Sequence, residues 1–110
     1  MNEKDYKIIF CIVNAGFSDE VMDAARSAGA TGGTVIRGRG TANREAEDFF
    51  HIQFQPDKEI IMILVPEEIR EAVLHALYRG VGLDTPGQGI AFCLPVDEVV
   101  GLPDAEKKQD

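Results

Sequence analysis

The sequence has few of the residues from which metal centres and disulfide frameworks are built. Its 110 residues include two cysteines, two histidines and no tryptophan. Cys11 and Cys93 each lie in an apolar, strand-like run, where we expect a small buried thiol in a reducing compartment; a disulfide is the alternative if the two strands are neighbours. We expect His51 to be a polar strand residue and His75 a solvated helix residue, so no metal site is predicted.

Long apolar runs and an excess of basic side chains are missing as well. No run approaches the roughly 20 residues of a membrane-spanning helix. The first residues, 1–5, are polar, which predicts a cytoplasmic protein without direct membrane insertion. The net charge is −8, from 19 acidic and 11 basic residues, and this disfavours nucleic acid as a partner.

Signatures of enzymes are scarce. The sequence contains neither a G-x-S-x-G motif nor a P-loop. Its serines are Ser18, expected to cap a helix, and Ser27, expected inside that helix, so no activated nucleophile is apparent. We therefore predict that the protein is not an enzyme.

The residues that are present have the composition of an ordinary globular protein, with 45% apolar and 27% charged residues. The length predicts a single domain spanning 1–110, with a short loop at about 41–48 and a polar tail at 104–110.

Apolar patterning predicts several strands. The runs at 6–13 and 59–65 lack alternation, which is typical of strands covered on both faces. The other expected strand segments are 34–36, the alternating segment 50–55, and 90–96.

Two helices are expected between these strands. The first begins at Ser18 and ends at Gly29, and the second follows Pro66 and closes at Gly80 and Gly82. The order strand–helix–strand–strand–helix–strand predicts an α+β fold, the ferredoxin-like βαββαβ sandwich, in which two helices cover one face of an antiparallel sheet. Because the strands are apolar on both faces, we expect self-association and clefts between subunits.

Two glycine segments are the candidates for a ligand site. The first is Gly38–Gly40, expected to be a loop, and the second is Gly87–Gly89, while Lys58 begins a third strand. Glycine lets backbone N–H groups approach an anion, and Arg37 and Arg39 supply forked donors suited to phosphate or carboxylate. A hairpin turn with solvated arginines is the alternative for the first segment.

Three stretches resemble the PII signal-transduction family, also called nitrogen regulatory P-II proteins. GATGGTVIRGRG resembles the entry into that family's T-loop, KEIIMILVPEE its third strand and second helix, and TPGQGIAFCLPV its B-loop and fourth strand. The resemblance covers about residues 6–100. It implies a homotrimeric sensor that binds an adenine nucleotide in the cleft between adjacent subunits and regulates a protein partner.

The resemblance also implies which residues bind the nucleotide. Lys58 matches a strand lysine near the phosphates, Thr31 a helix-end threonine near the adenine, and Leu64 a residue that lines the base pocket. The glycines of the two segments match those of the T-loop base and the B-loop. The full implied set is Thr31, Arg37, Gly38, Arg39, Gly40, Thr41, Lys58, Leu64, Gly87, Gln88 and Gly89.

The sequence departs from the family pattern in ways that concern the ligand. Gln88 stands where the family usually has an acidic residue, and Ile90 where it has a phosphate-binding lysine. The family's C-terminal arginine pair has no counterpart at 99–102, and the segment 41–48 is short and lacks tyrosine. The expected effector is therefore AMP or ADP rather than ATP, and the expected partner is a membrane transporter or a metabolic enzyme.

Other functions stay open at this point. In a small phosphohydrolase resembling acylphosphatases, an arginine of 37–39 would hold phosphate and Asn43 would orient water. A metal-responsive trimer resembling copper-tolerance proteins shares the expected fold. An assembly module that has lost ligand binding is the third alternative.

Overall fold

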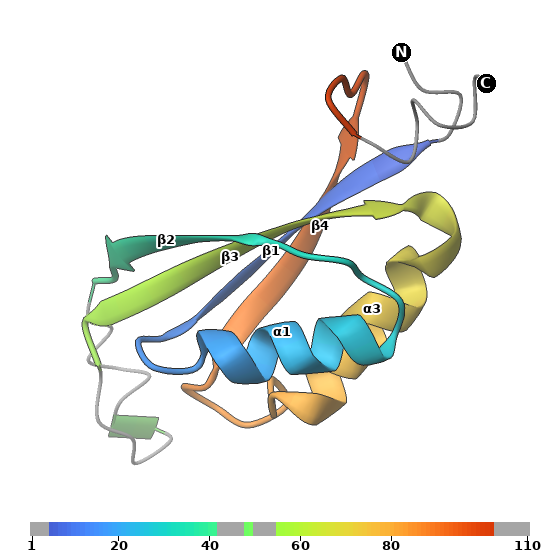
Figure 1. The fold of residues 1–110 in the computed structure, drawn as a ribbon. Helices are drawn as coiled ribbons and strands as arrows, with labels where there is room; N and C mark the ends of the chain where they lie inside the picture. The colour runs from blue at the N-terminus through green and yellow to red at the C-terminus, as the bar shows by residue number, and fades with distance from the viewer. Residues whose placement is uncertain (1–4, 42–47, 50–54, 103–110) are drawn as a thin grey trace, which may run out of the picture.

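A computed structural model of the chain describes residues 5–41, 48–49 and 55–102. The main elements follow one another in the predicted order (Figure 1). They are β1 (Tyr6–Asn14), α1 (Ser18–Ser27), β2 (Thr34–Arg39), β3 (Asp57–Pro66), α3 (Glu67–Gly80) and β4 (Gly89–Val96).

The strands form one antiparallel sheet in the order β2-β3-β1-β4. The central strands β1 and β3 pair from Tyr6 opposite Pro66 to Asn14 opposite Lys58. Helices α1 and α3 lie together on one face of this sheet (Figure 1). The predicted ferredoxin-like α+β arrangement is therefore confirmed.

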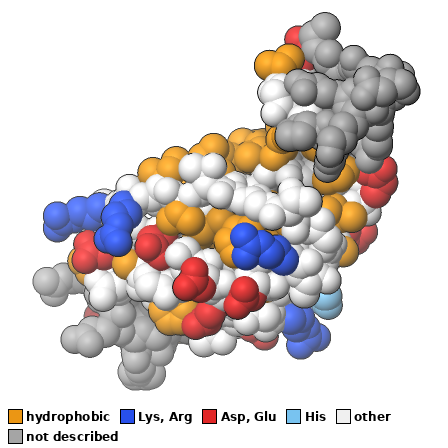
Figure 2. Space-filling model, in the orientation of Figure 1, with side chains coloured by type: hydrophobic (Ala, Val, Ile, Leu, Met, Phe, Trp, Pro, Cys, Tyr) orange, Lys and Arg blue, Asp and Glu red, His pale blue; other side chains and the backbone are white. Residues whose placement is uncertain are grey.

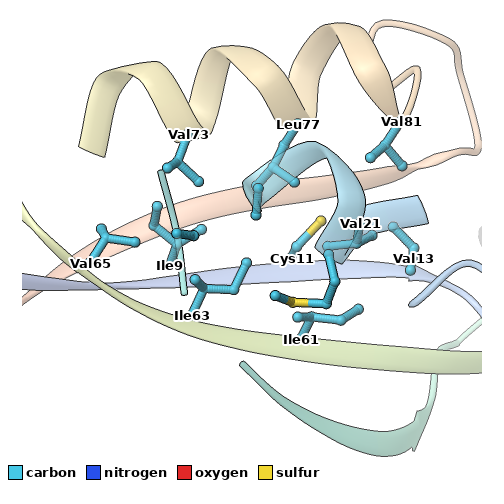
Figure 3. Close-up of a cluster of buried hydrophobic side chains, with 13 residues drawn as sticks. Ile9, Cys11, Val13, Val21, Ile61, Ile63, Val65, Val73, Leu77 and Val81 are labelled. Carbon is cyan, nitrogen blue, oxygen red and sulfur yellow. The ribbon is translucent and has the colours of Figure 1, made fainter. Parts of the chain in front are cut away.

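The hydrophobic core lies between the sheet and the two helices (Figure 3). Side chains alternate along a strand, and every second residue is buried against the helices from Ile9 to Val13 in β1 and from Glu59 to Val65 in β3. The largest fully buried side chains are Ile9, Ile61, Ile63, Leu77, Val13, Val21, Val65, Val73 and Cys11. Burial of this apolar surface is the main force that holds the helices on the sheet.

Glycines end both helices, as predicted. After α1, the N–H groups of Gly29 and Ala30 donate to the carbonyl oxygens of Arg26 and Ala25 at 3.0 and 3.1 Å. These are the two hydrogen bonds of a Schellman motif, and they require the positive φ of 108° that Gly29 adopts. Gly82, with φ 79°, follows α3 in the same way.

The start of α1 differs from the prediction. Phe17 occupies the N-cap position, Ser18 is the first helical residue, and no side chain caps the helix. The expectation that Ser18 is the cap is therefore wrong. Phe17 packs against the core, which fixes where the chain enters the helix, and Asp19 and Glu20 supply the negative charge that a first turn favours.

The second strand is longer than the predicted 34–36. Residues 37–39 continue β2 and pair with residues 57–59 of β3, so the expectation of a loop directly after Ile36 is wrong. The extension arises because antiparallel hydrogen bonds with β3 hold the glycine-containing segment in line. Residues 50–54, which include His51, most of the segment 41–48, and the tail 104–110 lie outside the described residues.

The two cysteines lie on neighbouring strands and are both free thiols. Cys11 is opposite Ala91 and Cys93 is opposite Ile9, so the cysteines are diagonal neighbours. Diagonal neighbours are about 7–8 Å apart, whereas a disulfide needs Cβ atoms about 3.8 Å apart. Burial raises the pKa of the Cys11 thiol to about 11, which keeps it protonated.

The second face of the sheet has no helix on it within the described residues, and we call it the open face. Ile90 is 58% exposed there, Leu94 47%, and the ring of Phe92 stacks on that of Phe10 with centroids 5.4 Å apart. Strands with both faces apolar are confirmed. The apolar residues of the open face are Ile8, Phe10, Ile12, Ile36, Ile60, Met62, Leu64, Ile90, Phe92 and Leu94.

Candidate functional site

The two glycine segments lie at the same end of the sheet. Gly38 is opposite Lys58 in the β2–β3 pair, and Lys58 is opposite Asn14 in the β3–β1 pair. Gly89 lies opposite Val13, one residue before the end of β1. The strand register therefore brings together the first segment, the lysine and the second segment from three distant parts of the chain.

Side-chain hydrogen bonds join Lys58 to the second glycine segment. The Nζ of Lys58 donates to Oδ1 of Asn14 at 2.6 Å, and Nδ2 of Asn14 donates to the carbonyl oxygen of Gly87 at 3.4 Å. Lys58 is half-buried. A short hydrogen bond from a charged donor is stronger than one between neutral groups. The ammonium therefore has a defined place at the corner of the sheet that Lys58, Asn14 and Gly87 form.

Backbone contacts fix the same corner. The N–H of Gly40 donates to the carbonyl oxygen of Pro56 at 2.8 Å, which anchors the end of the first segment, and Thr41 beyond it is exposed. The N–H of Gly16, in the turn after β1, donates to the buried carboxylate of Glu59 at 3.0 Å. Both contacts hold the start of β3, where Lys58 lies.

The second glycine segment has a shape that only glycine allows. Gly87 has φ 83° and Gly89 has φ 152°. A Cβ on Gly89 would collide with the carbonyl oxygen of Ile12. Gln88 turns toward the end of α3, where its Nε2 donates to the carbonyl oxygen of Val81 at 3.1 Å. The glycines are thus required by the backbone itself, whatever they bind.

The two arginines of the first segment do not share a face with Lys58. Arg37 lies opposite Glu59 and Arg39 opposite Asp57, on the helix side of the sheet, whereas Lys58 is on the open side. Figure 2 shows basic and acidic side chains next to one another at this end of the molecule. Each arginine thus has an acidic residue as its partner in the strand register, and opposite charges on neighbouring strands attract one another.

Thr31 and Leu64 lie far from the glycine segments within one chain. Leu64 is six positions along β3 from Lys58, which corresponds to about 20 Å of strand. Thr31 is exposed and precedes Thr34, which pairs with Met62, so it lies toward the Leu64 end of the sheet. One copy of the chain therefore does not bring the whole implied set around a single ligand.

The described residues do not support the metal-responsive alternative or the phosphohydrolase alternative. Throughout the described ranges, no three His, Cys, Asp or Glu side chains gather where they could hold a metal ion. Asn43, on which the phosphohydrolase alternative depends, lies outside those ranges. Within the same part of the chain, no helix is both long enough and apolar enough to cross a membrane.

Sequence patterns missed two residues of this corner. Asn14 is a polar residue at the end of the mostly apolar strand β1, and Glu59 is an acidic residue directly before the apolar run of β3. Each departure from an apolar run is a signal, but the sequence alone predicts a contact for neither residue. Their contacts arise because the strand register places the end of β1 beside the start of β3.

Two solved structures show a similar fold. Arabidopsis thaliana PII bound to citrate has a TM-score of 0.68 and 23% identity, with 94% of this chain and 85% of that chain covered. CPII from Thiomonas intermedia, bound to ADP, AMP and acetate, has a TM-score of 0.67 and 19% identity, with coverages of 93% and 94%. No curated protein sequence matches the chain.

The sequence itself matches a family model. The model describes nitrogen regulatory protein P-II, and the match extends over residues 6–106, from the first residue of β1 to beyond the last strand. The fold and strand order, which resemble those of the two solved PII structures, agree with this sequence match. The chain belongs to the nitrogen regulatory protein P-II family.

Proposed function

We propose that the chain is a non-enzymatic signal-transduction protein that binds an adenine nucleotide at its two glycine segments. The observation that carries the proposal is the Lys58 ammonium, held by Asn14 beside Gly87. An ammonium next to approachable glycine backbone suits phosphate oxygens. The similar CPII is bound to ADP and AMP, and the similar plant PII to citrate, which supports an anionic effector for this chain as well.

The nucleotide lies between two copies of the chain in this proposal. Leu64 is about 20 Å from Lys58 along β3, too far to meet the same ligand in one copy, and Thr31 lies toward the Leu64 end of the sheet. A neighbouring copy that covers the open face would supply that end of the sheet and bury the exposed apolar residues. We therefore propose a homotrimer, in which Thr31 and Leu64 contact the adenine and the glycine segments contact the phosphates.

A nucleotide with few phosphates fits this corner best. Position 90 contributes an apolar isoleucine that is 58% exposed, instead of a further cation. Arg37 and Arg39 face Glu59 and Asp57, which leaves Lys58 as the cation of the open side at this corner. We propose AMP or ADP rather than ATP, because each added phosphate brings charge that this set of residues does not balance.

The bound nucleotide is proposed to change how the protein contacts a cytoplasmic target, either a membrane transporter or a metabolic enzyme. The segment 41–48 follows Gly40 directly in the sequence, and Gly40 is anchored to β3 next to Lys58. A ligand at this corner therefore acts beside the start of that segment. We propose the segment as the contact with the target.

Calorimetric titration with AMP, ADP and ATP tests the proposal, together with the mass of the protein in solution. We expect micromolar binding of AMP or ADP to an assembly of three times the 12.0 kDa chain. Binding of ATP far tighter than that of ADP and AMP would contradict the preference for few phosphates. Absence of binding by all three nucleotides would contradict the proposed function.

A charge-matched pair of variants locates the site. Lys58→Ala should weaken binding about tenfold or more, because it removes a charged hydrogen-bond donor to phosphate. Arg26→Ala removes an exposed cation from the last turn of α1, on the helix side, and should bind like the wild type. Equal affinities of the two variants would contradict the placement of the phosphates at Lys58.

A further inference from the structure

Asn14 lies between the two parts of the candidate site. It closes β1, and its side chain is on the open face together with that of Lys58, its partner in the strand register. Its Oδ1 accepts the 2.6 Å hydrogen bond from Lys58, and its Nδ2 donates the 3.4 Å hydrogen bond to the Gly87 carbonyl oxygen. One side chain thus contacts both the cation and the glycine backbone.

We propose that Asn14 is a positioning residue, which orients the Lys58 ammonium toward the anion and connects it to the second glycine segment. The inference rests on the proposed function, since the anion is the phosphate of the bound nucleotide. A lysine side chain has many rotamers in solution, and fixing it in place before the ligand arrives removes part of the entropy loss from binding.

The chemistry of the contact fits an amide. An ammonium only donates and a carbonyl only accepts, so the amide oxygen has to face Lys58 and the amide nitrogen has to face Gly87. A carboxylate would also hold the lysine, but it would offset its charge and could not donate to the Gly87 carbonyl. A neutral asparagine orients the lysine without cancelling the charge that attracts an anion.

The second glycine segment, which accepts the hydrogen bond from Asn14, is itself held in place by contacts with α3 and β1. Gln88 is held to the end of α3 through its hydrogen bond with the Val81 carbonyl oxygen. Gly89 packs so closely against Ile12 that no side chain fits. The two residues that follow Gly87 are thus held by contacts of their own, which limits how far the Gly87 carbonyl oxygen can move away from Asn14.

A double-mutant comparison tests whether Asn14 acts through the lysine. Asn14→Ala should weaken ADP binding about tenfold in the wild-type background. It should weaken binding little further in the Lys58→Ala background, because no ammonium is left to orient. Equal fold-losses in the two backgrounds, or no loss in the first, would overturn the inference.

Ser27→Ala is the matched control for Asn14→Ala. It also removes a hydrogen bond from a polar side chain to a backbone carbonyl, the 2.6 Å contact of Ser27 Oγ with Ala24 O at the end of α1. We expect ADP affinity equal to that of the wild type. If Ser27→Ala and Asn14→Ala weakened ADP binding equally, a general loss of stability would explain both and the positioning role would be overturned.

Asn14→Asp supplies a readout that a purely structural role would not change. The carboxylate keeps an acceptor for Lys58 and adds a negative charge beside the phosphates. ADP binding should therefore weaken more than AMP binding, because ADP carries more negative charge. An equal weakening of the two nucleotides would overturn the inference.

Inorganic pyrophosphate separates this inference from the proposed function. If the wild-type protein bound no adenine nucleotide, the proposed function would fail. The positioning role would then be judged by pyrophosphate, which needs the oriented cation but no adenine pocket. About tenfold weaker pyrophosphate binding by Asn14→Ala supports the role; unchanged binding, or no binding by the wild type, overturns it.

Discussion

At Gly89 the backbone adopts a φ of 152°, and a Cβ would collide with the carbonyl oxygen of Ile12 and contact Val13 Cγ1 at 3.0 Å. Gly89→Ala should therefore lower the free energy of unfolding by about 2 kcal/mol or more. Urea denaturation measures this. Gly32→Ala is the control, because nothing lies within 4 Å of a Cβ there, and its effect should stay within about 0.5 kcal/mol.

A large decrease in the free energy of unfolding for Gly32→Ala, together with a small decrease for Gly89→Ala, would contradict the close approach of β4 to β1 at Gly89. The comparison also concerns function. If Gly89→Ala abolishes nucleotide binding, unfolding of the second glycine segment is a sufficient cause, so Lys58 and Asn14 are better positions for testing the ligand.

The buried thiol of Cys11 predicts a dependence of stability on alkaline pH. Its pKa rises from 9.0 to about 11 because burial disfavours the thiolate. Below pH 9 the thiol is protonated in both states. Between about pH 9 and pH 11 only the unfolded chain releases the proton, so the free energy of unfolding should fall by up to about 3 kcal/mol as pH rises.

Urea denaturation across this alkaline range measures the effect. In Cys11→Ala the decrease should be smaller than in the wild type, because the titrating group is gone. Cys93→Ala removes the other thiol, which lies on the same face of the neighbouring strand, and should keep the wild-type decrease. Parallel curves for the wild type and Cys11→Ala would show that another group causes the dependence.

The turn between β1 and α1 depends on a carboxylate from β3. Glu59 is buried and accepts the 3.0 Å hydrogen bond from the N–H of Gly16. Glu59→Ala should lower the free energy of unfolding by about 1–2 kcal/mol, because the acceptor is lost. Glu59→Gln retains a carbonyl oxygen of similar reach and should lose less. Equal losses in urea denaturation would show that the charge, rather than the acceptor, stabilises the turn.

The elements themselves were largely predictable from the sequence, because alternation and helix ends are local. Gly29 and Gly82 follow the helices as expected, since a positive φ favours glycine wherever a Schellman motif forms. The prediction that Ser18 is the N-cap was wrong because capping preference takes no account of the packing of Phe17 against the core. Local chemistry thus gave the elements, but tertiary packing decided one helix start.

The arrangement of the site was less predictable, because it depends on pairing between distant residues. Arg37, Arg39 and Lys58 all belong to the predicted nucleotide-binding set, yet pairing with β3 places the two arginines on the opposite side of the sheet from Lys58. Asn14 contacts Gly87, 73 positions away in the sequence. Such contacts follow from strand register, which no single segment encodes.

At the scale of the whole molecule, the open face is an apolar surface that a single copy of the chain leaves exposed. Its apolar residues extend over all the described strands of the sheet, whereas on the helix side α1 and α3 bury the residues of the central strands β1 and β3. Exposed apolar patches of this kind mark interaction surfaces. The same assembly that covers the face would also bring Thr31 and Leu64 of one copy toward the glycine segments of another.

Leu94→Lys tests whether this face holds the assembly together. Leu94 is 47% exposed on β4, so a lysine there leaves the core intact but places a charge in the proposed interface, where an unpaired buried charge is unfavourable. We expect the proposed trimer to become a monomer, as measured by light scattering after size-exclusion chromatography.

Tyr78→Lys is the matched control, because Tyr78 is 48% exposed but lies on α3, where it lines a groove of about 520 Å³ between that helix and β4. The proposed trimer should persist in this variant. The opposite pattern, with Tyr78→Lys monomeric and Leu94→Lys trimeric, would place the interface in the α3–β4 groove. The adenine end of the nucleotide site would then have to come from a different part of the neighbouring copy, because the open faces would no longer meet.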